Sequence, residues 1–218
     1  MAERIQPQPR RFDTTRPGVL CNPYLDLFRS LPPSYRRCPQ LAVDARELTS
    51  PEWLSFKSHI ATTYAWAVPT DDAIATIGRH GKQVVEIGSG SGYWAWMLEQ
   101  AGIQVQAFDA APQQFTWHLV RRGTSADAAR YPGHSLLLCW PPWGTSMAFD
   151  TLREYTGQTV VYIGEWMMGC ADARFFALLR ADFDAVDGAE LPQWYMRDDR
   201  LLVFRRRGTR NLVGGHTN

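Results

Sequence analysis

This chain of 218 residues has few cysteines and lysines and almost no net charge. The four cysteines show neither C-x-x-C spacing nor a nearby pair of histidines, so no zinc site and no disulfide framework is predicted. Cysteines of this kind are typical of a reducing, intracellular setting. A formal charge of +1 gives no electrostatic reason to expect nucleic acid as a partner. Only Lys57 and Lys82 are lysines, and we attribute that scarcity first to coding bias.

Long apolar runs are also missing. Residues Met1 to Gly18 are polar and rich in Arg, Gln and Pro, without the apolar centre of a signal peptide. No stretch reaches the ~18 apolar residues of a membrane helix. We therefore expect a soluble, cytoplasmic protein with no membrane partner. A hydrophobic content of 45% in 218 residues suits one compact domain with a full core.

Proline and helix-start signals divide the chain. Residues 1–40 hold seven of the fourteen prolines, which predicts an extended arm with a short helix at Tyr24 to Leu31. Ser50-Pro51 and Thr70-Asp71 each read as a helix start. We expect an N-terminal arm and helical lid over residues 1–69, a ligand-binding core over 70–207, and a flexible tail over 208–218.

Strand and helix patterns alternate through the core. The chain ends on two consecutive strand-like segments with no helix between them, which predicts an antiparallel hairpin. The fold class expected is therefore α/β, with a doubly wound, mostly parallel sheet closed by that hairpin. The predicted strands are 83–87, 105–108, 117–120, 135–139, 159–163, 183–191 and 201–206; the predicted helical segments are 93–101, 125–130, 147–155 and 171–181.

The segment Val84 to Gly92, Val-Val-Glu-Ile-Gly-Ser-Gly-Ser-Gly, predicts an apolar strand that runs directly into a glycine turn. Glycine allows positive φ and lets a ligand touch the backbone, while the following helix offers free N–H groups. The dinucleotide spacing G-x-G-x-x-G would need its third glycine where Tyr93 stands. Glu86 would also repel a diphosphate, so the turn favours a cationic or hydroxylated ligand.

A second acid, Asp109, ends the next predicted strand about twenty residues after the glycine turn, where a carboxylate can hold ribose hydroxyls. With these motifs the chain resembles the class I S-adenosylmethionine-dependent methyltransferases over roughly residues 66–206. The resemblance implies a Rossmann-like core and S-adenosylmethionine as cofactor. It also implies a cofactor site formed by Glu86, Gly88, Ser89, Gly90, Gly92, Asp109, Ala110, Trp140 and Pro141.

Ligands in such folds bind beyond the carboxyl ends of the strands, where two further segments lie. Trp140-Pro141-Pro142-Trp143 resembles the D/N/S-P-P-Y/F/W motif of amino-methyltransferases, but Trp140 has no side-chain oxygen to accept a hydrogen bond from an amine. Two indoles around two prolines instead predict a rigid wall for a flat substrate. In many relatives an acid bonds the adenine amine; here Ser125 or Asp127 is available, and the sequence favours neither.

Methyl transfer needs a base only when the nucleophile must lose a proton. Glu165, delivered by the fifth strand, is the first candidate, Tyr64 the second, and His134 a weaker third. An aromatic substrate pocket is predicted from Tyr24, Trp66 and Trp143.

The function expected is methylation of a small planar aromatic metabolite. A narrower resemblance, to small bacterial enzymes that methylate carbon 3 of indole in tryptophan-containing cyclodipeptides, implies closure to a pyrroloindoline. Three alternatives stay open: an amino-methyltransferase acting on adenine in nucleic acid or on protein, a non-catalytic cofactor-binding protein, and an NAD-dependent oxidoreductase. Nothing in the sequence fixes the oligomeric state.

Overall fold

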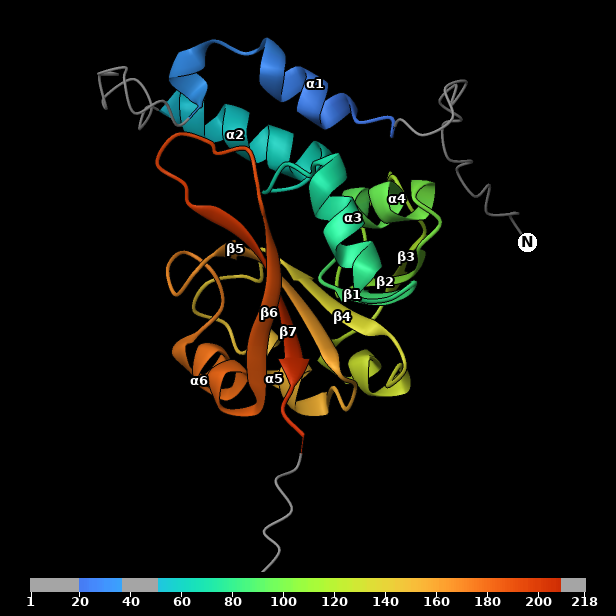
Figure 1. Ribbon diagram of the computed structural model, residues 1–218. Coiled ribbons are helices and arrows are strands. Elements are labelled where there is room, and N and C mark those ends of the chain that lie inside the picture. The colour runs from blue at the N-terminus through green and yellow to red at the C-terminus, as the bar shows by residue number, and fades with distance from the viewer. Residues whose placement is uncertain (1–19, 37–50, 209–218) are drawn as a thin grey trace, which may run out of the picture.

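The structure is a computed structural model that describes residues 20–36 and 51–208, the side chains of 51–54 excepted (Figure 1). The arm before residue 20, residues 37–50 and the predicted tail from 209 onward lie outside this description. The described elements are α1 (Pro23–Ser30), η1 (Pro33–Tyr35), α2 (Pro51–Thr63), α3 (Asp71–Arg79), β1 (Gln83–Ile87), α4 (Tyr93–Gln100), β2 (Gln104–Asp109), β3 (Val120–Arg122), η3 (Ser125–Arg130), β4 (Ser135–Cys139), α5 (Met147–Glu154), β5 (Thr159–Glu165), α6 (Ala173–Asp182), β6 (Phe183–Glu190) and β7 (Asp199–Arg206).

The strands form one seven-stranded sheet in the order β3-β2-β1-β4-β5-β7-β6. The first five strands pair in parallel, whereas β7 pairs antiparallel with both β5 and β6. A parallel neighbour needs a crossover, while β6 and β7 follow one another without a helix and so form a hairpin. The predicted fold class, a Rossmann-like and mostly parallel sheet ending in an antiparallel hairpin, is confirmed.

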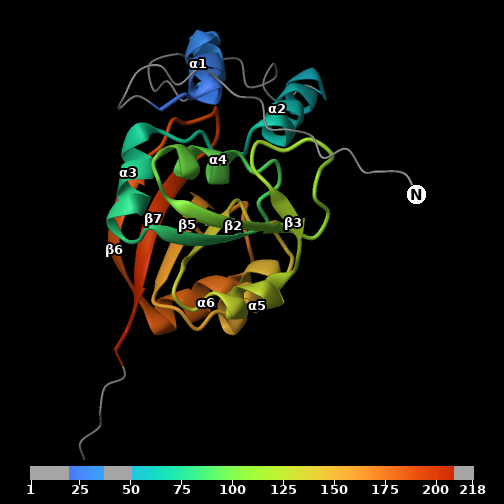
Figure 2. The same ribbon diagram turned by 90° about the vertical axis from the view of Figure 1, so that its right-hand side faces the viewer.

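Alternate residues of the strands belong to two hydrophobic cores, one on each face of the sheet. Val84 packs with the helices α1, α3 and α4, and its neighbour Val85 packs with α5 and α6. Figure 2 shows α3 and α4 on one side of the sheet and α5 and α6 on the other. Both faces are therefore covered, as a parallel sheet requires.

The helix α3 starts where the sequence predicts, α1 starts at Pro23, one residue before the predicted Tyr24, and the predicted N-cap Ser50 lies outside the described residues. Thr70 caps α3, since its hydroxyl accepts the Ala73 N–H at 3.1 Å. In α1, the backbone N–H of Tyr24 donates to the Tyr93 hydroxyl at 3.0 Å, which ties this helix to α4. Whether the N-terminal region acts as a lid stays a prediction. Within residues 20–36 and 51–208, no helix has the length and apolar composition to cross a membrane.

The third strand differs from the prediction. We expected a strand at residues 117–120, but β3 covers Val120–Arg122. The Trp117 backbone N–H donates to the Ser91 carbonyl at 2.8 Å, and its indole N–H donates to the Thr63 carbonyl at 2.7 Å. Trp117 therefore binds the glycine turn and the end of α2 instead of the sheet, which a pattern of apolar residues does not reveal.

Candidate functional site

A cavity of about 340 Å³ lies beyond the carboxyl ends of β1, β2 and β4. This is where ligands bind in open α/β sheets. The lining comes from the glycine turn, the segment after β2, and the residues after α2 and β4. The residues that line it are Ala61, Thr62, Tyr64, Ala65, Trp66, Glu86, Ile87, Gly88, Ser89, Gly90, Ser91, Tyr93, Trp94, Asp109, Ala110, Gln113, Gly123, Thr124, Ser125, Cys139, Trp140, Pro142 and Met147.

The glycine turn has the backbone that its sequence predicts, since Gly88, Gly90 and Gly92 all have positive φ, at 80°, 53° and 72°. A Cβ on Gly88 would stand 2.6 Å from the Met147 methyl, whereas a Cβ on Gly90 would meet no protein atom within 4 Å. Because Gly90 lines the cavity, that free space is space for a ligand. Gly92 is the N-cap of α4 and does not line the cavity.

Asp109 joins the end of β2 to the glycine turn. One of its carboxylate oxygens accepts the Gly90 N–H at 2.9 Å, and the other accepts the Ala111 N–H at 2.9 Å. Both Asp109 and Ala110 line the cavity. The carboxylate is thus held in a fixed position, with lone pairs left for a further donor such as a hydroxyl.

Glu86, at the end of β1, is the most unusual charged group of the site. Only 1% of its surface is exposed, and its Oε2 has no hydrogen-bond partner among the described residues. Burial raises the pKa of its carboxyl to about 8, and the nearby Asp109 carboxylate adds to the effect. A buried acceptor without a donor is costly, so this oxygen suits a ligand that brings a cation or an N–H.

Aromatic rings form another part of the lining, called here the aromatic wall. Trp140 follows β4, and its indole stacks on Trp66 with ring centroids 5.3 Å apart and an angle of 23° between the planes. Trp66 is 39% exposed and Trp140 lies deeper. Trp140 has a left-handed backbone with φ of 49°, which is rare for a residue other than glycine. The cavity therefore contains both two stacked indoles and a buried carboxyl.

Two charged residues that the sequence analysis missed lie behind this wall. The Asp199 carboxylate accepts the Trp140 indole N–H at 2.6 Å, and Lys57 Nζ donates to the Trp66 carbonyl at 3.0 Å. Both side chains are buried. For Lys57 a signal existed, because one of only two lysines stood in a helix with apolar neighbours. For Asp199 the sequence held no signal, since an acid at the start of a strand is ordinary.

The predicted base candidates lie in different surroundings. Tyr64 lines the cavity and stacks on Tyr24, with centroids 4.9 Å apart, and on Trp117, at 5.5 Å. The Ser91 hydroxyl donates to the Tyr64 carbonyl, which ties this segment to the glycine turn. Tyr24 itself is fully buried and does not line the cavity.

Glu165 does not line the cavity, although it ends β5 as predicted. Its carboxylate accepts from the Arg197 guanidinium and from the Asp198 backbone N–H, both at 3.3 Å. Trp143 is 74% exposed and Pro142 lines the cavity, whereas Pro141 does not. Within residues 20–36 and 51–208, no group of three or more His, Cys, Asp or Glu side chains could hold a metal ion.

The two candidates for adenine recognition are separated. Ser125 lines the cavity, and its hydroxyl donates to the Met147 carbonyl at 3.1 Å. Asp127 instead forms the capping box of η3 with Thr124 and pairs with Arg130 at 2.8 Å. Both carboxylate oxygens of Asp127 are thus engaged within η3.

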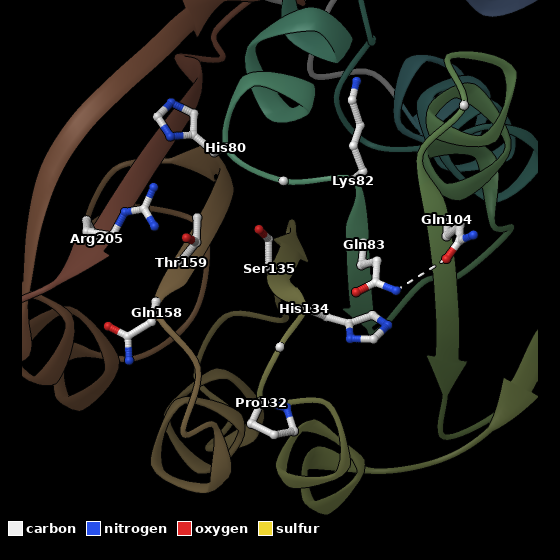
Figure 3. Close-up of a pocket in the computed structure, with 13 residues that line it drawn as sticks. His80, Lys82, Gln83, Gln104, Pro132, His134, Ser135, Gln158, Thr159 and Arg205 are labelled. Atoms are coloured by element: carbon white, nitrogen blue, oxygen red, sulfur yellow. Dashed lines mark hydrogen bonds between the residues drawn. The ribbon is translucent and has the colours of Figure 1, made fainter.

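A second hollow, of about 520 Å³, lies at the amino ends of the strands, and Figure 3 shows its lining. His134 lies here, so it is far from the glycine turn. In Figure 3 the side chains do not converge: Lys82 points away, while Gln83 and Gln104 bond to each other at 3.3 Å. With no buried unpaired group and no carboxyl-end loops, this hollow is the weaker candidate.

No protein-family model and no curated protein matches the chain. Among solved structures, it is similar to the 1,6-didemethyltoxoflavin-N1-methyltransferase of Burkholderia thailandensis, with 13% identity over 79% of this chain and 94% of that one and a TM-score of 0.48. An O-methyltransferase from Bacillus cereus is 14% identical over 77% and 94%, with a TM-score of 0.46. N-methyltransferase NodS from Bradyrhizobium japonicum is 13% identical over 86% and 100%, at 0.43. Because these similarities are distant, the function has to be inferred from the residues of the chain itself.

Proposed function

We propose that the protein binds S-adenosylmethionine in the cavity beside the glycine turn and transfers its methyl group to a small planar aromatic molecule. The observation that carries this proposal is that one cavity contains both the Glu86 Oε2, which has no hydrogen-bond partner among the described residues, and the free space above Gly90. A neutral ligand would leave Glu86 protonated, with its Oε2 still lacking a hydrogen-bond partner. A cationic amine supplies both the charge and the donor.

The polar groups of the cavity fit the polar groups of this cofactor. Glu86 would hold the ammonium group, and Asp109 would hold the ribose hydroxyls, since its carboxylate is already fixed by Gly90 and Ala111. Gly88 and Gly90 allow close approach to the backbone, and Ser125 offers a hydroxyl for the adenine end. When bound, S-adenosylmethionine supplies an electrophilic methyl group.

The chain's own task in such a displacement is to align the nucleophile and to exclude water. The aromatic side of the cavity suits both tasks, since Tyr64, Trp66 and Trp140 present large rings and no charged group. Flat rings bind flat substrates by stacking. A small planar aromatic substrate is therefore favoured, and carbon 3 of indole in a tryptophan-containing cyclodipeptide is the narrower candidate.

We retain Tyr64 and Glu165 as candidate bases, in a changed order. Tyr64 lines the cavity and can reach a substrate directly. Glu165 does not line the cavity, and its neighbour Arg197, whose guanidinium binds it at 3.3 Å and lies 5.5 Å from the Trp140 ring centre, cannot relay a proton because it has no acceptor atom. Tyr64 is thus the first candidate.

An amino-methyltransferase is the second candidate function, and the hydrogen bonding of Trp140 disfavours it. Its indole N–H, the one polar atom of the side chain, is a donor that already binds Asp199. It therefore cannot accept a hydrogen bond from the amine of an adenine or of a protein side chain. Single-turnover transfer to any acceptor would exclude a non-catalytic cofactor-binding protein, and failure to bind S-adenosylhomocysteine would favour the third alternative, an NAD-dependent oxidoreductase.

Calorimetry with S-adenosylhomocysteine, the product of the cofactor, tests the proposal. The wild-type protein should bind it, and Gly90→Ala should lower the affinity at least about ten-fold, because the new methyl group occupies ligand space. Gly102→Ala is the matched control. That glycine also has positive φ, at 72°, and open space around its Cβ, but it does not line this cavity.

Each outcome has a distinct meaning. Both alanines should destabilise the fold by ~1–2 kcal/mol through the left-handed backbone, so only the difference between them reports on the cavity. Absence of binding to the wild-type protein would overturn the proposal, as would equal affinity in the two variants. A methyl-transfer screen of indoles, amines, phenols and nucleosides then identifies the acceptor, and transfer to amines alone would refute the aromatic substrate.

A further inference from the structure

We propose that Asp199 and Lys57 are positioning residues that hold the stacked indoles of Trp140 and Trp66 as a fixed wall of the cavity. Neither residue lines the cavity, so both would act through the indoles. The inference rests on the proposed function for its ligand, a planar aromatic molecule.

Asp199 is the anchor of Trp140. One carboxylate oxygen accepts the indole N–H at 2.6 Å, a short distance typical of a bond to a charged acceptor. The backbone of Asp199 is itself fixed by Gln193, which accepts its N–H at 2.8 Å and donates to its carbonyl at 2.7 Å. The second carboxylate oxygen has no hydrogen-bond partner within the described part of the chain. Among the described residues, the bond to the indole N–H is thus the one hydrogen bond of this buried carboxylate.

Lys57 plays the corresponding part for Trp66. Its ammonium donates to the Trp66 carbonyl at 3.0 Å and lies 5.6 Å from the centre of the same indole and 4.2 Å from that of Trp194. Lys57 is only 6% exposed. A lysine on an exposed helix face would make no such contacts. The burial of Lys57 therefore ties α2 to the aromatic wall.

The two charges depend on each other. Burial lowers the pKa of Lys57 to about 7 and raises that of Asp199 to about 7, and each opposes the other's shift through its charge. The indole bond also lowers the Asp199 pKa, the Glu165 carboxylate raises it, and the Arg197 guanidinium lowers the pKa of both groups. Removing the charge of Lys57 therefore weakens the contact of Asp199 with Trp140, and removing the charge of Asp199 weakens the contact of Lys57 with Trp66.

Trp140 needs such an anchor because its backbone is strained. A left-handed φ of 49° in a bulky residue costs roughly 1–3 kcal/mol and persists only where surrounding contacts impose it. The contacts that impose it are its N–H, which donates to the Ile163 carbonyl at 2.7 Å, and the indole bond to Asp199. The stack with Trp66 then transmits this orientation to the more exposed ring.

The experiment observes the indole N–H signals by nitrogen-15 NMR on the full chain, which has nine tryptophans. Trp140→Phe assigns the Trp140 signal by its disappearance. In Asp199→Asn this signal should move upfield, because a neutral amide accepts more weakly than a carboxylate. Asp198→Asn is the matched control: the Asp198 side chain is half-exposed and paired with Arg200 at 2.9 Å, and its replacement should leave the Trp140 signal in place.

Binding measurements complete the test, with indole as the planar probe and S-adenosylhomocysteine as the cofactor probe. Asp199→Asn and Lys57→Met should each weaken indole binding about five-fold, equivalent to ~1 kcal/mol, and leave cofactor affinity within about two-fold. If Asp199→Asn does not fold, Lys57→Met carries the test, since removing this charge should also move the Trp140 signal and weaken indole binding.

An unmoved Trp140 signal in Asp199→Asn, or unchanged indole binding in the variants, would overturn the inference. A wild-type protein that fails to bind S-adenosylhomocysteine would overturn the proposed function alone, because the NMR result does not depend on a cofactor. The two failures are thus distinguishable.

Discussion

Replacing Glu86 by glutamine should change stability and cofactor affinity in opposite directions. Glutamine has nearly the same shape as glutamate and stays neutral at every pH. Burial raises the pKa of Glu86 from 4.5 to about 8, so between these values the folded protein holds a proton that the unfolded chain releases. The free energy of unfolding contributed by this group therefore falls as pH rises through that window.

The size of the effect follows from the two pKa values. The difference between 4.5 and about 8 corresponds to about 5 kcal/mol once the pH exceeds 8. Glu86→Gln should thus be more stable than the wild type by on the order of 3–5 kcal/mol at pH 9, with the advantage vanishing near pH 4.5. Denaturant unfolding of both proteins at several pH values measures the difference, and groups common to both cancel.

Cofactor binding should move the other way. At pH 7 the Glu86 carboxyl of the ligand-free protein is mostly protonated, so an ammonium that binds beside it should expel about 0.9 proton. Calorimetry with S-adenosylhomocysteine in two buffers of different ionisation enthalpy measures that proton. Glu86→Gln should release none and bind about 10-fold to 100-fold more weakly, the range for a lost bond to a charged group.

Two results would refute this reasoning. A glutamine variant that is less stable than the wild type at pH 9 would show that Glu86 is solvated or paired in the folded protein. An unchanged affinity, with no proton released by the wild type, would show that the ligand's cation lies elsewhere.

Three further predictions concern other parts of the molecule. Tyr64→Phe should lower turnover in single-turnover methyl-transfer assays more than Glu165→Gln does, because only Tyr64 lines the cavity; the reverse order would restore Glu165 as the base. Asp172→Ala should lower the free energy of unfolding by ~1 kcal/mol in urea, since its carboxylate caps α6 through the Phe175 N–H. Asp187→Asn should lower the free energy of unfolding at pH 7 but not at pH 2, because the hydrogen bond from His80 holds the Asp187 pKa at about 2. The stabilisation from this carboxylate is present above pH 3.8 and is lost as the pH falls through about 2. Equal acid unfolding curves for the variant and the wild type would contradict this prediction.

Much of the fold could be predicted because its signals are local. The bounds of β1 and β4 agree with the predicted strands, since each is a short apolar run that ends at a turn or polar residue. The glycine turn and Asp109 are likewise recognisable from residue type and spacing. β3 was misplaced because Trp117 is held by partners that lie far from it in the sequence.

The aromatic side of the site was predicted only in part. Trp140 and Trp66 stood out as tryptophans near a strand end and in the region before the core. Their anchors, Asp199 and Lys57, could not be assigned, because only the folded chain brings the start of β7 and the middle of α2 to the same indole pair. Glu165 shows the converse: a strand end places a residue at the correct edge but does not determine where its carboxylate points.

The division of the cavity between two sets of elements has an evolutionary consequence. Its cofactor side comes from β1, β2 and the turn between β1 and α4, whereas its aromatic wall depends on the segment after α2, the segment after β4 and the start of β7. Mutations at Trp66 or Trp140, or at the charges behind them, can thus alter selectivity while Glu86 and Asp109 stay intact. Under the proposed function, related chains can therefore differ in substrate and keep the same cofactor site.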